Sequence, residues 1–276
     1  MRAERYWQAA LERSAAALGC GALVPLDTEV VEAPNCNPFV LRRLLGAPPR
    51  HLRAEGPRPN PFLPWERQLE VSRLGDGHLL LLNKYPVQTG HLLLITQRWQ
   101  PQSGWLDSID WQAVAHVGAD TGGLWFFNNS PTAGASQPHR HLQLLPRALG
   151  EVSCPLADRF KAQLMGLETG WSWAYRLDRR VGTSANDLES LYRSHCDSLG
   201  IGRPERDSSP LHPYNLLFDD DWFLTIRRTR EHGAGFSVNA LGFAGYLLLT
   251  ERSDLAWLRR HGPLCLLQEV AASGEV

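Results

Sequence analysis

The segment SQPHRHLQLLP, residues 136–146, carries polar side chains at every second position of an otherwise apolar run. These side chains are His139, His141 and Gln143. Successive side chains of a β-strand point to opposite faces of the sheet, so the three share one face and the leucines between and after them share the other. If the leucines face the core, the two imidazoles and the amide face a cleft or solvent.

Three roles are open to His139 and His141. They could be structural histidines with satisfied hydrogen bonds beside a loop. They could also bind a metal ion, because two histidines at alternate positions of a strand present two nitrogens to one ion. Such a site needs a third His, Cys or carboxylate ligand, and Gln143 is a poor one. The third role is nucleophilic chemistry at phosphorus, which depends on the neighbouring residues.

The segment before this strand, FFNNSPTAGASQPH, is rich in small residues and hydrogen-bond donors. Small residues allow backbone N–H groups to approach an anion closely, and Asn, Ser and Gln side chains add further donors. The candidate phosphate-binding residues here are Asn128, Asn129, Ser136 and Gln137. An imidazole with a pKa of about 6.5 is mostly unprotonated at neutral pH and can attack phosphorus without another base. The combination suits nucleotidyl transfer, in which the ring attacks an α-phosphate and the donors hold its oxygens.

Basic side chains that could meet a polyphosphate come from two further places. Only two of the 28 basic residues are lysines. Lys84 ends an apolar strand where the chain turns, a position that suits an ammonium–phosphate contact as well as a solvated lysine. A second basic cluster surrounds Arg228 and lies close in sequence to Asn239. Because a polyphosphate carries several negative charges, one lysine is insufficient, and Arg228 and Asn239 are further candidates for substrate binding. We interpret His91 as structural.

Hydrophobic periodicity places the polar strand in an α+β protein with a mainly antiparallel sheet flanked by helices. Strands are predicted at residues 65–74, 78–84, 91–96, 124–129, 139–145, 171–177 and 221–228, the first two joined as a hairpin by a glycine turn. Helices are predicted at residues 4–18, 107–118, 155–167, 185–199, 237–249 and 253–270. Residues 47–64 are proline-rich and predict a long loop.

The composition is typical of a cytosolic globular protein with one large or two small domains. The chain has 276 residues and a formal net charge of −1, so no basic excess favours nucleic acid or an anionic membrane. Five cysteines without CxxC spacing indicate neither a disulfide framework nor a zinc knuckle, and they fit a reducing cytoplasm. No apolar run is long enough to span a bilayer, and the charged N-terminal segment predicts a helix rather than a signal peptide.

The HRHLQ sequence resembles the HxHxQ form of the histidine-triad superfamily. Three segments narrow the resemblance to the family of diadenosine tetraphosphate (Ap4A) phosphorylases, also called ATP adenylyltransferases. They are NKYPVQTGHLLLIT, FFNN…GASQPHRHLQ and PYNLLF…FSVNALGFAGYLL. The resemblance implies a histidine-triad-like fold extended by N-terminal and C-terminal segments. Residues 1–180 would hold the HxHxQ strand, and residues 181–276 would complete the fold and the substrate cleft within one structural unit.

The resemblance also implies a reaction, in which a dinucleoside tetraphosphate and phosphate give ATP and ADP. His141, the middle member of the motif, would be the nucleophile that carries AMP, and His139 would support and orient it. Gln143 stands where the hydrolytic branch of the superfamily has a third histidine. A neutral amide can hold a phosphoryl oxygen but cannot act as a general acid or base, which offers a reason why phosphate is the acceptor instead of water. Lys84 matches a substrate-contacting lysine in the family's NK motif.

Related functions stay open at this point. A galactose-1-phosphate uridylyltransferase also uses an HxHxQ strand, but it has Pro and Gly where this chain has Arg140 and Leu142, and its metal cluster has no evident counterpart. Sulfate could replace phosphate as the acceptor, and a non-catalytic nucleotide-binding regulator could retain the same residues. The expected partners are dinucleoside polyphosphates, ATP, ADP and inorganic phosphate, with no nucleic acid and no membrane. The nucleophile requires no metal or cofactor, although Mg²⁺ could accompany the polyphosphate substrate.

Overall fold

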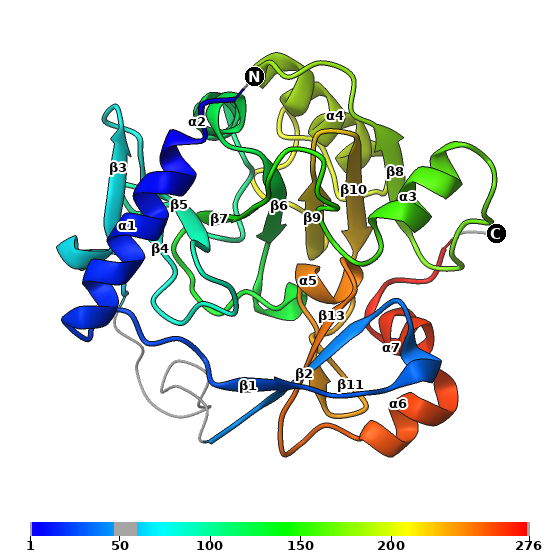
Figure 1. Cartoon of the computed structure of the whole chain (residues 1–276). Helices are drawn as coiled ribbons and strands as arrows, with labels where there is room; N and C mark the ends of the chain where they lie inside the picture. The colour runs from blue at the N-terminus through cyan, green and yellow to red at the C-terminus, as the bar shows by residue number, and fades with distance from the viewer. Residues whose placement is uncertain (1, 47–59, 275–276) are drawn as a thin grey trace.

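The computed structural model describes residues 2–46 and 60–274. At its centre lies an eight-stranded antiparallel sheet with the strand order β3-β4-β5-β7-β6-β9-β10-β8 (Figure 1). Its strands are β3 (Glu70–Leu74), β4 (His78–Leu82), β5 (Leu92–Thr96), β6 (Gly123–Asn128), β7 (His141–Pro146), β8 (Tyr175–Arg179), β9 (Tyr214–Phe218) and β10 (Trp222–Arg227). The predicted α+β class with a mainly antiparallel sheet is confirmed. Strands from both sides of the predicted boundary at residue 180 enter this one sheet.

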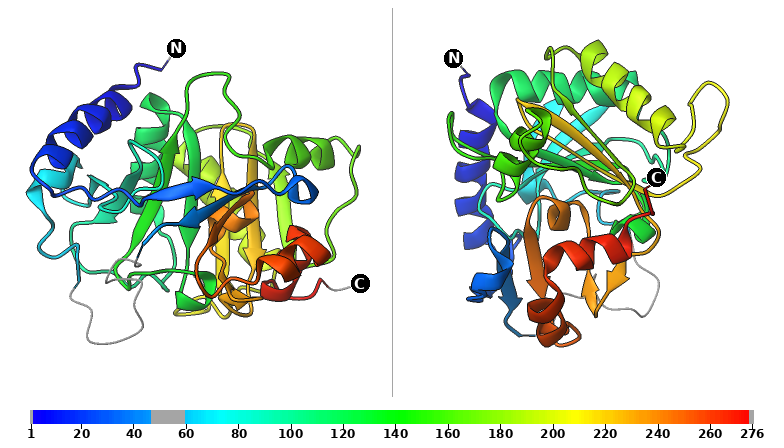
Figure 2. Two further views of the ribbon diagram at one scale, coloured as in Figure 1. Left: turned by 60° about the horizontal axis from the view of Figure 1, so that its bottom comes forward. Right: turned by 90° about the vertical axis from the view of Figure 1, so that its right-hand side faces the viewer.

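Three helices cover one face of the large sheet: α1 (Arg5–Gly19), α2 (Ser108–Asp120) and α4 (Ala185–Ser198). The right-hand view of Figure 2 shows α2 and α4 together on this side. Their apolar side chains pack with those of β4, β5 and β7 in one core, around the fully buried Trp111. The side chain of Asp107 begins α2 by accepting hydrogen bonds from backbone N–H groups of its first turn.

A second layer covers the opposite face. It contains α3 (Ala157–Leu164), α5 (Ala240–Phe243), α6 (Leu255–His261), α7 (Pro263–Val270), the short hairpin of β11 (His232–Gly233) and β12 (Phe236–Ser237), and a small sheet. The small sheet has β2 (Val40–Leu44) in the middle, antiparallel to β1 (Thr28–Val30) and parallel to β13 (Tyr246–Leu249). These elements form a second core against the large sheet, which is therefore buried on both faces. Such burial explains why its inner strands are mostly apolar, whereas the edge strands β3 and β8 carry charged side chains.

Two helix predictions in the C-terminal part are corrected. The helix predicted at residues 237–249 is wrong, because only Ala240–Phe243 are helical and the following residues form β13. The change occurs at Gly245, whose φ of 101° ends the helix. β13 then pairs with β2, about 200 residues away in sequence, and such a long-range contact leaves no local signal. The helix predicted at 253–270 is divided into α6 and α7 at Pro263, which has no N–H for a continuous helix.

The remaining predictions are mostly confirmed, with shifted boundaries. The predicted helices at 4–18, 107–118, 155–167 and 185–199 correspond to α1, α2, α3 and α4, and the hairpin of β3 and β4 is present. The strand predicted at 171–177 begins only at Tyr175, and the central strand β9 was not predicted. Residues 47–59 of the predicted proline-rich loop lie outside the described residues. Within the described ranges, no helix combines the length and apolar composition needed to cross a membrane.

Candidate active site

The HxHxQ motif lies in the middle of the large sheet, on β7 and immediately before it. Leu142 and Leu144 are fully buried in the core beneath α2, as the alternation predicted. His141 and Gln143 project from the opposite face of the strand and are only 4% and 9% exposed, and His139 is fully buried. The face of β7 that carries His141 and Gln143 is therefore sheltered from water. In such a setting hydrogen bonds to charged groups are strong.

The imidazole of His141 is held in one tautomer by the backbone. Its Nδ1 lies 2.8 Å from the carbonyl oxygen of His139. A carbonyl can only accept, so Nδ1 carries the proton and Nε2 keeps its lone pair. Burial lowers the pKa of His141 to about 4, so the ring stays neutral at neutral pH. Nε2 of His141 thus keeps an unprotonated lone pair at neutral pH, as a nucleophile requires.

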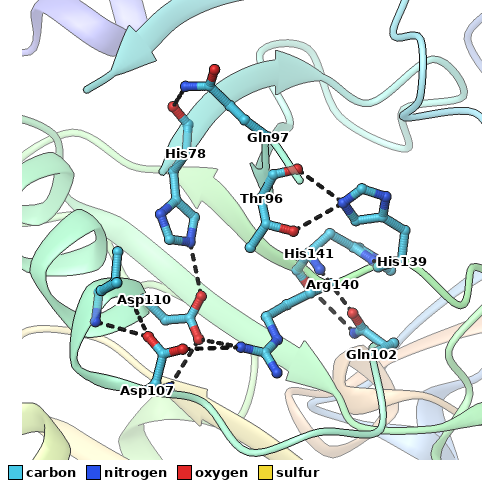
Figure 3. A network of polar contacts seen from close by, with 10 residues as sticks. His78, Thr96, Gln97, Gln102, Asp107, Asp110, His139, Arg140 and His141 are labelled. Atoms are coloured by element: carbon cyan, nitrogen blue, oxygen red, sulfur yellow. Dashed lines mark hydrogen bonds and ion pairs between the residues drawn. The ribbon is translucent and has the colours of Figure 1, made fainter. Parts of the chain in front are cut away.

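The backbone of His141 is fixed by the side chain of Gln102. The Gln102 Oε1 accepts from the His141 N–H at 2.8 Å. The Gln102 Nε2 donates to the carbonyl oxygens of His141 at 3.2 Å and Asn128 at 2.7 Å. The ladder between β6 and β7 ends one step earlier, at Phe126 and Gln143. The buried amide of Gln102 therefore takes the place of a peptide group where the two strands separate (Figure 3).

His139 is oriented by hydrogen bonds at both of its ring nitrogens. The backbone N–H of Phe62 donates to Asn60 Oδ1, so the Asn60 Nδ2 is the donor that faces His139 Nδ1 at 3.0 Å. His139 Nε2–H then donates to the Thr96 carbonyl oxygen at 2.9 Å. Both ring nitrogens of His139 are occupied, and burial lowers its pKa. His139 thus holds His141 through its carbonyl oxygen and has no nitrogen free for a metal ion.

Arg140, between the two histidines, anchors the strand from its other face. Its guanidinium donates to the Asp110 carboxylate at 2.9 Å, and Asp110 lies 2.8 Å from the Nε2 of His78 on β4 (Figure 3). Arg140, Asp110 and His78 are almost fully buried. A Cβ at Gly104 would lie 2.7 Å from the Arg140 guanidinium, so this position has room only for glycine unless the arginine shifts. The ion pair connects the HxHxQ strand to the N-terminus of α2.

The loop before β7 contributes polar atoms that no described residue satisfies. The Nδ2 of Asn129, the Oγ of Ser130 and the Oε1 of Gln137 are buried without a hydrogen-bond partner within the part of the chain that the structure describes. Ser136 is half-buried in the same loop. Buried polar groups are almost always paired, so unpaired ones in the loop next to the HxHxQ strand indicate groups that bind a ligand.

Asn128 and Arg228 were predicted to bind substrate, but their side chains form hydrogen bonds with other groups of the protein. The Asn128 Oδ1 accepts from the Asn215 Nδ2 at 2.8 Å and from the first backbone N–H of α5 at 2.9 Å. The Arg228 guanidinium donates to Asn215 and to several carbonyl oxygens, and it stacks over Phe243 at 5.2 Å. Burial lowers the pKa of Arg228 to about 9, which leaves it cationic at neutral pH. This geometry favours a framework role for both residues, because together they hold the loop between β6 and β7, residues 129–140. We call this segment the donor loop.

Asn239 packs directly against the donor loop. Its side chain accepts from the Leu241 N–H at 2.9 Å and so begins α5. Gly134, with a φ of 84°, lies so close that a Cβ there would be 2.6 Å from the Cβ of Asn239. Glycine is required at this position by both its conformation and the close approach. Substrate contact by Asn239 stays a prediction.

Lys84 lies at the end of β4, close to the segment that follows residue 59. Its ammonium forms an exposed ion pair with the Glu66 carboxylate. The same segment places Phe62 against the rings of His139 and His141, with centroids 5.6 and 5.4 Å apart. Exposed ion pairs are weak, so a polyphosphate could compete with Glu66 for the ammonium.

Several site residues were missed in the sequence, namely Asn60, His91, Thr96 and Gln102. Gln102 and Asn60 lie in loops, where no periodicity marks them. His91 shares a face with Gln143 only through the register of β5 on β7, in which Leu93 faces Gln143. The only sequence signal for His91 was its place as a polar residue directly before an apolar strand. In the described ranges, no group of three or more His, Cys, Asp or Glu side chains could hold a metal ion.

We expect the fold to lose stability in mild acid because of three buried histidines. Burial lowers the pKa of His91, His141 and His195 to about 4, against about 6.5 in an unfolded chain. Their contribution is complete above about pH 6.5 and is lost as the pH falls toward about 4, by up to about 1.4 kcal/mol per pH unit for each ring. The urea midpoint should fall over this range, and less steeply in the His195→Gln variant. A constant midpoint would contradict this expectation.

Comparisons with known proteins agree with this geometry. Residues 1–161 match the Ap4A phosphorylase N-terminal domain, and residues 167–273 match the ATP adenylyltransferase C-terminal domain. Diadenosine 5',5'''-P1,P4-tetraphosphate phosphorylase 2 of Saccharomyces cerevisiae is 35% identical over 236 residues, which cover 74% of this chain and 71% of the yeast protein. Protein APA1 of the same organism is 37% identical over 76 residues, about a quarter of each chain.

The fold is also that of a solved relative. The crystal structure of yeast Ap4A phosphorylase Apa2 superposes with a TM-score of 0.77 over the whole of both chains, at 21% identity. Its complex with Ap4A superposes with a TM-score of 0.72, also over the whole of both chains. Fold and site thus define an enzyme of the nucleotidyl-transferring class with an HxHxQ strand. Within that class, the chain belongs to the Ap4A phosphorylase family, also called ATP adenylyltransferases, and the resemblance seen in the sequence is confirmed.

Proposed function

We propose that this enzyme catalyses the reversible phosphorolysis of diadenosine tetraphosphate to ATP and ADP through AMP bound covalently to His141. The observation that carries the proposal is the fixed tautomer of His141, with Nδ1–H held by a carbonyl oxygen and Nε2 free. Family membership supports the same reaction, and so does the crystal structure of the yeast phosphorylase Apa2 in complex with Ap4A.

The reaction has two steps, and each breaks one bond to phosphorus. His141 Nε2 bonds to an α-phosphorus of Ap4A while the bond from that phosphorus to the bridging oxygen breaks, which releases ATP. An oxygen of inorganic phosphate then bonds to the same phosphorus, the bond to Nε2 breaks, and ADP leaves. The ring is cationic while both nitrogens are substituted, and the His139 carbonyl oxygen 2.8 Å from Nδ1 stabilises that charge. In this proposal Asn129, Ser136, Gln137 and Gln143 hold the phosphoryl oxygens, and the buried, unpaired Nδ2 of Asn129 supports it.

We propose no protein-bound cofactor for this chemistry, since the neutral ring requires no activation. Mg²⁺ would enter with the polyphosphate, whose oxygens are ligands that it prefers. The cysteine pattern favours a cytoplasmic location, where Ap4A, ATP and phosphate would be the partners.

Nucleotide chromatography tests the proposal. Purified protein is mixed with Ap4A, with phosphate, with sulfate and with neither, each with and without Mg²⁺. ATP and ADP in equal amounts, dependent on phosphate, are the expected result. AMP and ATP without phosphate would indicate a hydrolase, and turnover with sulfate alone would indicate a different acceptor. Binding without turnover would indicate a regulator, and any of these three results would overturn the proposal.

We expect Lys84→Ala to lower kcat/KM for Ap4A by about tenfold to a hundredfold, since it removes a charged hydrogen bond to phosphate. The melting temperature should hardly change, because the ion pair of Lys84 with Glu66 is exposed. Lys161→Ala is the matched control, because the other lysine also sits in an exposed ion pair, 2.6 Å from Asp221. An equal fall of kcat/KM in the two variants would show that Lys84 does not contact the substrate.

A further inference from the structure

The amide of Gln143 is oriented by a relay that begins at a backbone group. The Tyr85 N–H lies 3.1 Å from the Asn83 Oδ1. A backbone N–H can only donate, so the side-chain oxygen of Asn83 is the acceptor. The Nδ2 of Asn83 is therefore the atom that faces His91, 3.2 Å from its Nδ1.

This arrangement fixes the proton on His91. Because Nδ1 accepts from Asn83, a neutral ring must carry its proton on Nε2. Burial lowers the pKa of His91 to about 4, so the ring is neutral at neutral pH. The ring is also held by Phe126, with centroids 5.9 Å apart. His91 Nε2–H thus donates to the Gln143 Oε1 at 3.0 Å.

The hydrogen bond from His91 also determines where the NH₂ group of the Gln143 amide points. Its oxygen is taken by His91, so its NH₂ group is directed away from that ring, on the strand face that carries His141. No residue in the described ranges accepts a hydrogen bond from this NH₂ group. A flip of the amide would bring two donors, the NH₂ group and His91 Nε2–H, against each other, so the relay permits one orientation.

We propose that His91 is a positioning residue, which keeps Gln143 as a hydrogen-bond donor toward the adenylyl phosphate and so disfavours water as the acceptor. The inference rests on the proposed function and names the group that decides between phosphate and water. An amide NH₂ stabilises the anionic oxygens of a phosphoryl group. An amide oxygen would instead accept a hydrogen from water and orient it for attack. Phosphate is already an anion and needs no such acceptor.

Two variants at His91 test the relay. His91→Leu removes both hydrogen bonds, whereas His91→Gln can accept from Asn83 and donate to Gln143. With Ap4A and a fixed phosphate concentration, hydrolysis releases AMP from the adenylyl-enzyme and phosphorolysis releases ADP. We expect the ratio of AMP to ADP to rise on the order of tenfold in His91→Leu and to return toward the wild-type value in His91→Gln. This ratio does not depend on the amount of folded enzyme.

His195→Leu is the matched control for the loss of a buried histidine. His195 is also fully buried and makes two side-chain hydrogen bonds, to Thr225 and Asp178, both 3.0 Å long and away from β7. An unchanged ratio in folded His91→Leu, or an equal rise in His195→Leu, would overturn the inference. So would a wild-type ring of His91 protonated at Nδ1 in ¹⁵N NMR, a result that requires no stable variant. Failure of wild-type protein to form ADP and ATP would instead refute the proposed function.

Discussion

The His141→Asn enzyme should form no adenylyl-enzyme and lower kcat for phosphorolysis by about a thousandfold or more, because the covalent route is lost. Asparagine is the informative replacement. Its Nδ2 can donate to the His139 carbonyl oxygen, as the histidine Nδ1 does at 2.8 Å, so the strand keeps its geometry. Nucleotide chromatography gives kcat, and the intact mass of protein incubated with Ap4A alone reports the adenylyl group.

His195→Asn controls for the removal of a buried histidine elsewhere in the protein, on α4. This variant should still accept the adenylyl group from Ap4A. Because burial lowers the pKa of His141 to about 4, protonation of this ring should not slow wild-type adenylylation until the pH approaches that value. An adenylylated His141→Asn protein would show that another residue is the nucleophile.

Arg140→Met should destabilise the fold by about 3–5 kcal/mol, the usual cost of leaving one member of a buried ion pair without its partner. The Asp110 carboxylate, 1% exposed, would keep only His78 and a backbone N–H. For a protein of this size the loss corresponds to a fall in melting temperature of about 5–9 °C. Differential scanning calorimetry measures it.

Arg203→Met is the matched control for this substitution. Arg203 pairs with Asp197 on the surface, where both side chains are nearly half exposed, so its loss should leave the melting temperature almost unchanged. Equal shifts in the two variants would mean that burial adds nothing to the pair of Arg140 and Asp110. A normal melting temperature in Arg140→Met would exclude the pair as an anchor of the HxHxQ strand.

Much of the fold could be predicted because its signals are local. The alternation around Leu142 and Leu144 predicted both the strand and the face that its histidines occupy. The glycine turn near Gly75 predicted the first hairpin. β13 could not be predicted in this way, because its partner β2 lies about 200 residues earlier and the segment also has helical periodicity. Pairing over such distances is decided by tertiary contacts.

The part of the site that could be predicted consists of residues whose side-chain type itself indicates the chemistry. His139, His141 and Gln143 lie together as their spacing predicted, beside a loop with unpaired polar atoms. Residues that act through others gave no such signal. The position of His91 beside Gln143 follows from strand register, and the enclosure of Arg228 follows from packing of the second layer. Neither can be read from neighbouring sequence.

The order of strands in the large sheet has a consequence for how this protein could be divided or recombined. The two matched family regions meet where β6 pairs with β9, from Trp125 with Phe218 to Asn128 with Asn215. Cutting the chain between them would leave each fragment with an open, apolar strand edge, which invites aggregation. We therefore expect the two regions to fold as one unit, so that neither could be exchanged with a relative as an independent module. A gene that encoded them separately would have to rely on the fragments finding each other during synthesis.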